Sequence, residues 1–138
     1  MTFREAVDVC LKRKYFFKFA GRAPRSEFWW FAVFMWCVNF VTGLLAMIFP
    51  PTLGASLVVL VSLLLFPASL GVSVRRLHDR ELSGWWLLLP ASFLLFGAGL
   101  GIIGGILAFG VCLVFIIIYC MPGTPGPNRF GANPLMKQ

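Results

Sequence analysis

The sequence predicts an all-α integral membrane protein with four short transmembrane helices, arranged as two hairpins and preceded by an amphipathic interfacial helix. Hydrophobic residues make up 59% of its 138 residues, and charged residues only 12%. A soluble domain of this length has too small a core to bury so much apolar surface. Long uncharged segments alternate with short basic ones, which is the pattern of a chain that crosses a bilayer several times.

The first element expected is a helix over residues 2–19, with Thr2 and Glu5 forming a capping box at its start. Lys14 and Lys18 fall near its apolar face, where their stems can extend toward headgroups. This face either lies on the membrane or packs on the protein's own cytosolic surface, and the pattern does not distinguish the two. The face is formed by Phe3, Ala6, Val7, Cys10, Leu11 and Phe17.

Two uncharged segments of 22 residues each, 28–49 and 53–74, form the first predicted transmembrane hairpin. At 1.5 Å per residue, each is long enough to cross a hydrocarbon core of about 30 Å. Only Pro50–Thr52 separate the two segments, so the connection is a tight turn. Pro67 is expected to kink the second helix, as membrane helices tolerate.

The second predicted hairpin comes from residues 85–120, which contain no charge over 36 residues. A single helix of that length would reach about 54 Å, far more than one span needs. Five glycines in Gly97–Gly105 favour a turn there, dividing the segment into spans at about 85–100 and 101–120. The same glycines could also serve as small-residue packing faces.

The charge distribution predicts the topology. Four spans place every basic segment, and both termini, on the cytoplasmic side, whereas the alternative of three spans would move Arg129 and Lys137 across the membrane. Three regions follow: residues 1–27, an amphipathic helix with a basic linker; residues 28–120, the transmembrane bundle; and residues 121–138, an irregular tail rich in proline and glycine. The expected interface anchors are Trp29, Trp30, Trp85 and Trp86.

Charged side chains from three segments are expected to meet on the cytoplasmic face. One interpretation is an ion-pair network that fixes the helix ends, formed by Glu27, Asp79, Arg75 and Arg76. The arginines outnumber the carboxylates, however, and a planar guanidinium suits bidentate binding of phosphate. The second interpretation is therefore a site for anionic lipid headgroups, with Arg22, Arg25, Arg75, Arg76, His78 and Arg129 as candidate binding residues.

Catalytic and metal chemistry find little support. Four cysteines without a CxxC motif and a single histidine offer no metal set, and no cofactor is expected. His78 beside Asp79 suggests acid–base chemistry, but no nucleophile accompanies the pair. Ser83 is better explained as a helix N-cap. The main hypothesis is a non-enzymatic protein that binds anionic lipid or a membrane-protein partner rather than nucleic acid. The alternatives are a subunit of an oligomeric channel or transporter, with the chain as a homo-oligomer, and a headgroup-modifying enzyme.

Three motifs together resemble the YhaH-like bacterial inner-membrane family, which contains the domain of unknown function 805. They are GRAPRSEFWW (Gly21–Trp30), RRLHDRELSGWW (Arg75–Trp86) and PGTPGPNRFGANP (Pro122–Pro134), and their order and spacing cover nearly the whole chain. The resemblance implies a small multi-pass protein of the bacterial cytoplasmic membrane. It implies no reaction, ligand or cofactor. The glycine-rich Gly97–Gly105 stretch is longer than the family pattern suggests, and a single last span would give three spans.

Overall fold

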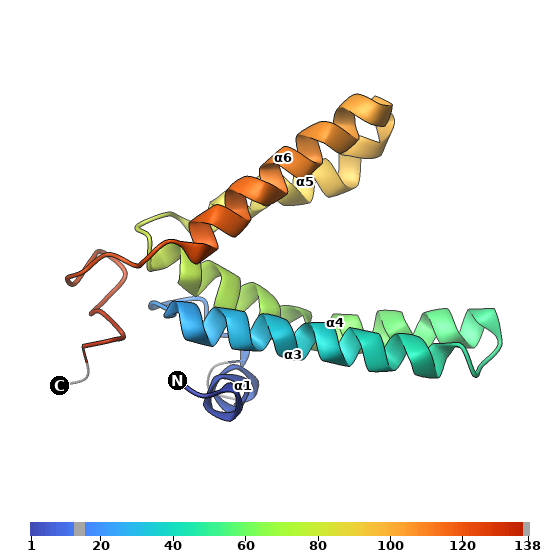
Figure 1. Ribbon diagram of the computed structural model, residues 1–138, viewed down its shortest axis with the longest axis horizontal. Coiled ribbons are helices and arrows are strands. Elements are labelled where there is room, and N and C mark those ends of the chain that lie inside the picture. Colours follow the sequence, from blue (N-terminus) through green and yellow to red (C-terminus); the bar gives the residue numbers. More distant parts are fainter. Residues whose placement is uncertain (13–15, 137–138) are drawn as a thin grey trace. The chain divides into compact units, whose positions relative to one another are not determined.

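The structure, a computed structural model, describes residues 1–12 and 16–136, and this part of the chain is helical without a β-strand (Figure 1). It divides into two compact units, Met1–Phe19 with Ser26–Ser73 and Ala20–Arg25 with Val74–Gln138, here called unit 1 and unit 2. The all-helical fold class is thus confirmed. The α-helices are α1 (Phe3–Leu11), α3 (Arg25–Ala46), α4 (Pro51–His78), α5 (Leu88–Phe96) and α6 (Gly101–Cys120); the 3-10 helices are η1 (Gly84–Leu87) and η2 (Gly97–Leu100).

Unit 1 contains most of the hairpin of α3 and α4, up to Ser73 of α4, and the two helices lie side by side in Figure 1. Its turn is tight, because a Cβ added at Gly54 would overlap the backbone of Ala46. Halfway along, the hydroxyl of Ser62 donates to Asn39 Oδ1 at 3.4 Å. The helix α4 continues through Pro67 without interruption, which agrees with the tolerance of proline in membrane helices.

The N-terminal helix is shorter than predicted. Thr2 and Glu5 form the expected capping box, but the helix ends at Leu11, and Lys12 adopts an extended ψ of 134°. The physical reason is that the sequence interrupts the apolar stripe there: the next position on the same face after Cys10 and Leu11 is Lys14, and Phe17 follows only one turn later. The prediction for Lys14 itself lies outside the described residues.

The apolar face of α1 packs within unit 1 against the beginning of α3. Ala6 and Cys10 are fully buried, and Cys10 Sγ lies 3.8 Å from Glu27 Oε1. The rings of Phe3 and Trp30 meet edge to face, with their centroids 5.9 Å apart. These contacts favour the alternative in which the helix packs on the protein's own surface, and its placement on the membrane stays a prediction.

Unit 2 contains a second hairpin, in which the segment η1–α5–η2 returns alongside α6 (Figure 1). Ser83 caps η1 by accepting from the Trp85 N–H at 3.5 Å. The chain turns at Gly101, whose φ of +57° is a left-handed conformation that glycine adopts without strain. The two arms cross closely at Gly97 and Gly104, where a Cβ on Gly104 would overlap the Gly97 carbonyl.

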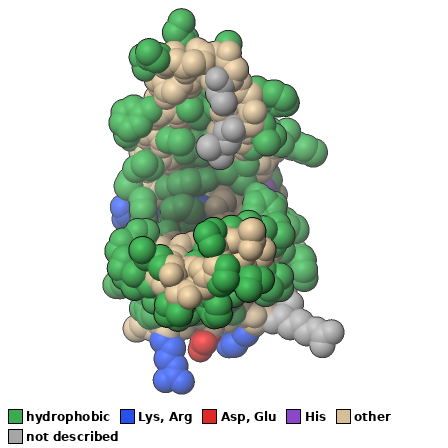
Figure 2. Space-filling model, turned by 90° about the vertical axis from the view of Figure 1, so that its right-hand side faces the viewer, with side chains coloured by type: hydrophobic (Ala, Val, Ile, Leu, Met, Phe, Trp, Pro, Cys, Tyr) green, Lys and Arg blue, Asp and Glu red, His purple; other side chains and the backbone are tan. Residues whose placement is uncertain are grey.

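The helices α3, α4 and α6 are each long and apolar enough to cross a membrane. Their mean hydropathies are 1.7, 2.4 and 2.8, and their apolar side chains are largely exposed. Figure 2 shows hydrophobic side chains predominating on the face it presents. The fourth predicted span, 85–100, differs from these three because it combines nine α-helical residues with a four-residue 3-10 helix at each end.

Gly104→Ala is expected to loosen the second hairpin, because the added methyl group would collide with the Gly97 carbonyl. Overpacking of this kind costs about 1–3 kcal/mol. Gly105→Ala is the matched control, since a Cβ there has nothing within 4 Å. Thermal unfolding in detergent should show a lower Tm for Gly104→Ala alone. Identical Tm values for the two variants would contradict the close crossing.

Candidate functional site

Asp79 is the centre of the polar cluster in unit 2. It follows α4 directly and is only 3% exposed. Its Oδ1 accepts from Arg22 Nε at 2.8 Å, and its Oδ2 accepts from Arg76 Nη1. Two arginines from segments far apart in the sequence therefore share one buried carboxylate. Removing one partner from a pair buried to this degree destabilises the folded state, because the charge left behind is uncompensated.

Arg22 connects Asp79 to the C-terminal tail. Its Nη1 donates to the Gly126 carbonyl at 2.6 Å and, more weakly, to that of Gly131 at 3.5 Å. Its Nη2 donates to the Thr124 carbonyl at 2.7 Å. The tail also contacts the residue that Arg22 pairs with, because Thr124 N donates to the Asp79 carbonyl at 2.9 Å. One guanidinium thus contacts three backbone carbonyls of an irregular segment.

A second group of arginines caps the C-terminal end of α6. The last carbonyls of a helix have no partner inside it, and they carry its negative dipole end. Here Arg76 donates to the carbonyls of Tyr119 and Met121, and Arg25 Nη1 donates to that of Cys120 at 3.2 Å. Arg80 Nη1 donates to the next carbonyl, that of Pro122, at 2.6 Å.

His78 is packed into the same unit by the tail. Its ring stacks on Phe130 at a centroid distance of 3.9 Å and an interplanar angle of 3°. Its Nδ1 lies 3.1 Å from the Gly21 carbonyl, and its own carbonyl accepts from Asn128 Nδ2 at 2.9 Å. These contacts connect His78 to Gly21 and to the C-terminal tail. Within residues 1–12 and 16–136, no three His, Cys, Asp or Glu side chains gather closely enough to hold a metal ion.

The candidate binding residues fall into a buried and an exposed class. Arg76 is 0% exposed, Arg22 and Arg75 are also buried, and the guanidinium donors of Arg22 and Arg76 contact Asp79 and the backbone. Arg25 and Arg129 are exposed. Glu27, the other member of the predicted network, belongs to unit 1.

Arg80 and Arg129 each use only part of their donor set on the described part of the chain. Arg80 is half-buried and has one backbone carbonyl and the Met121 sulfur as partners. Arg129 Nη2 donates to the Glu81 carbonyl at 2.7 Å, and its guanidinium lies 4.7 Å from the Phe130 ring centroid. Both guanidinium groups therefore keep donors that can reach a ligand at the surface.

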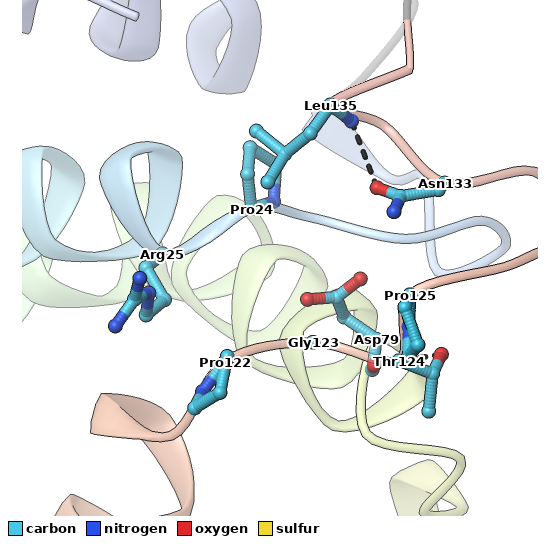
Figure 3. Close-up of a pocket in the computed structure, with 9 residues that line it drawn as sticks. All are labelled: Pro24, Arg25, Asp79, Pro122, Gly123, Thr124, Pro125, Asn133 and Leu135. Carbon is cyan, nitrogen blue, oxygen red and sulfur yellow. Dashed lines mark hydrogen bonds between the residues drawn. The ribbon is translucent and has the colours of Figure 1, made fainter.

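A cavity of about 200 Å³ lies beside Asp79 (Figure 3). Sequence reasoning missed this cavity and the backbone carbonyls that the arginines contact. The glycines of the tail were the available signal: a Cβ at Gly123 would overlap the Asp79 carboxylate, so only glycine lets the tail approach it. The cavity is lined by Pro24, Arg25, Asp79, Pro122, Gly123, Thr124, Pro125, Asn133 and Leu135.

Asp79→Ala is expected to destabilise the protein by about 3–5 kcal/mol, because Arg22 and Arg76 would lose their buried counter-charge. Asp8→Ala is the matched control, since Asp8 is exposed on α1. Thermal unfolding of both variants in the same detergent measures the difference. If both lowered the Tm equally, Asp79 would be a solvated residue rather than the centre of the cluster.

Known proteins give the family context of this site. The sequence model of the family DUF805, which is described as a protein of unknown function, matches residues 16–132. Inner membrane protein YhaH of Escherichia coli (strain K12) is 36% identical over 122 residues, which cover 86% of this chain and 88% of that protein. Inner membrane protein YhaI of the same strain is 35% identical over 119 residues, covering 84% and 85%. No solved structure was found to match. With its long apolar helices and these inner-membrane relatives, the chain is a membrane protein that belongs to the DUF805 family of unknown function.

Proposed function

We propose that this protein is a non-enzymatic, multi-pass protein of the inner membrane that binds anionic lipid headgroups at its cytoplasmic face. The observation that carries the proposal is the split among the arginines of unit 2. Arg22 and Arg76 are buried and bonded to the protein, whereas Arg25, Arg80 and Arg129 keep accessible donors. A folded cluster that leaves guanidinium groups accessible at its surface is suited to bind phosphate.

The depth of these residues supports a headgroup as the ligand. Arg25 contacts the carbonyl of the last residue of α6, a helix of membrane-spanning length, and Arg80 contacts the Pro122 carbonyl two residues beyond it. The exposed Trp85 and Trp86 begin the other arm of the same hairpin, and such aromatic residues prefer the membrane interface. Anionic headgroups concentrate at this level on the cytoplasmic leaflet.

We further propose that the membrane is crossed four times. The segment from Gly84 to Leu100 contains eight 3-10 and nine α-helical residues. Because a 3-10 helix rises about 2.0 Å per residue, this segment reaches about 30 Å, enough for a hydrocarbon core. Both termini are then cytoplasmic, and α1 lies at the cytoplasmic surface. Three spans, with the shorter segment left outside the membrane, is the alternative.

The four-span topology makes a direct prediction. A fluorescent protein fused to the C-terminus should be bright, and alkaline phosphatase fused at the same position should be inactive, because both would face the cytoplasm. The same pair fused to the N-terminus serves as the reference. A dark fluorescent fusion with an active phosphatase fusion would establish three spans.

Lipid selectivity tests the binding proposal. Arg80→Gln and Arg129→Gln together should weaken retention of anionic lipid by roughly tenfold or more, since each basic residue near the surface is worth about 1 kcal/mol. Native mass spectrometry with defined anionic and zwitterionic lipids measures the retained adducts. The Tm of the variant shows whether its fold is intact.

The control removes the same charge elsewhere. Arg4→Gln with Lys12→Gln removes two exposed cations, one from α1 and one from its C-cap. Their diffuse attraction should disappear at high salt, because the Debye length falls to about 3 Å at 1 M. Hydrogen-bonded contacts at Arg80 and Arg129 should be less sensitive to salt. Equal losses and equal salt dependence in the two double variants would refute a site at this cluster.

A further inference from the structure

We propose that the cavity beside Asp79 is a specific subsite for a phosphate ester that carries hydroxyl groups, such as the phosphoglycerol of a lipid headgroup. This inference rests on the proposed function and names the ligand chemistry of one part of the same surface. The cavity belongs entirely to unit 2, and its walls are formed by the linker residues Pro24 and Arg25, by Asp79 directly after α4, and by the tail. Figure 3 shows Asp79 between Arg25 on one side and Asn133 on the other.

The size of the cavity limits what it can hold. Its volume of about 200 Å³ is below the roughly 300–1,000 Å³ of pockets that enclose drug-sized ligands. A nucleotide or a peptide segment is therefore too large, whereas a small headgroup fits. Arg25 stands at the beginning of α3 and contacts the last residue of α6, so the cavity lies at the ends of membrane-length helices. Phospholipid headgroups occupy this depth.

The charge around the cavity favours an anion. Asp79 is the acidic residue of the lining, and Arg22 and Arg76 both bind its carboxylate. Adding Arg25, another lining residue, leaves these four side chains with an excess of two positive charges. A phosphate in the cavity would offset this excess in a site where solvent screening is reduced.

The lining also offers donors that the protein itself leaves unused. In the described part of the chain, neither the Gly123 N–H nor Asn133 Nδ2 has a hydrogen-bond partner. The other amide atom of Asn133, Oδ1, accepts from Leu135 N at 2.9 Å, and this bond fixes the orientation of the side chain. Together with Arg25, these groups can donate to the oxygens of one phosphate.

Asp79 determines which phosphate ester fits. A carboxylate can accept about four hydrogen bonds, and Arg22 and Arg76 supply two. Its remaining lone pairs accept from a hydroxyl group, as phosphoglycerol provides, but repel a second carboxylate, as phosphoserine provides. The cavity should therefore distinguish phosphatidylglycerol from phosphatidylserine, although both lipids carry a net negative charge.

The test compares phosphatidylglycerol, phosphatidylserine and phosphatidylethanolamine adducts of the full chain by native mass spectrometry, with glycerol 3-phosphate in a separate arm. The wild type should prefer phosphatidylglycerol over phosphatidylserine. Asn133→Asp keeps the oxygen that accepts from Leu135 but replaces the donor by a charged acceptor. It should reduce that preference by about tenfold, the effect of losing one charge-assisted hydrogen bond.

Ala132→Asp is the matched control, because it adds the same charge to an exposed neighbour that does not line the cavity. It should lower the retention of both anionic lipids without changing their ratio. Equal Tm values for the two variants show that the tail stays folded in both.

Each outcome separates the subsite from the broader function. A phosphatidylglycerol preference that only Asn133→Asp removes supports the subsite with a lipid as its source. A glycerol 3-phosphate adduct lost in the same variant, without lipid selectivity, supports the same chemistry with a soluble source. Equal retention of both anionic lipids over phosphatidylethanolamine, without a glycerol 3-phosphate adduct, overturns the subsite and leaves the proposed function intact. No preference for any anionic ligand overturns both.

Discussion

The polar end of unit 2 depends on one carboxylate shared by two arginines. Through Arg22, Asp79 fixes the tail, and through Arg76 it fixes the end of α6. Each guanidinium is buried and would be costly to bury without this counter-charge. Gly123 completes the arrangement, because its missing side chain lets the tail pass directly over the carboxylate. The linker, the end of α4 and the tail are therefore held together by charge rather than by a large apolar core.

Backbone carbonyls explain why this end is so rich in arginine. The end of α6 and the proline-rich tail expose acceptors that no regular secondary structure satisfies. Arginine carries five donors on a planar group, so a single side chain can satisfy several carbonyls while it pairs with a carboxylate. Arg22 does so for Thr124 and Gly126. Lysine would supply the charge but not this fixed geometry.

The sequence predicts the helices well, because charge-free length is a direct requirement of the bilayer. The turn between the last two helical arms falls within the glycine-rich stretch for a similarly local reason: Gly101 needs a left-handed φ. The extent of α1 was predicted less accurately, because Lys14 was treated as a snorkelling residue rather than as an interruption of the apolar stripe. The contacts of the tail could not be predicted from the sequence, since every residue has a backbone carbonyl and the residue type does not show which carbonyl accepts from an arginine.

The two classes of arginine have different consequences for function. The buried pair, Arg22 and Arg76, determines where the linker and tail lie, and so where Arg25 and Asn133 stand around the cavity. In the lipid-binding role proposed above, the exposed residues would exchange partners with a headgroup while this framework stays unchanged, because each retains donors beyond its bonds to the described residues. Under the same proposal, a change in the framework should alter both the stability and the lipid binding, whereas a change at the surface should alter the lipid binding alone. The difference between the two classes follows from burial. A charge in contact with water can lose a partner at little cost in stability, whereas a buried charge cannot.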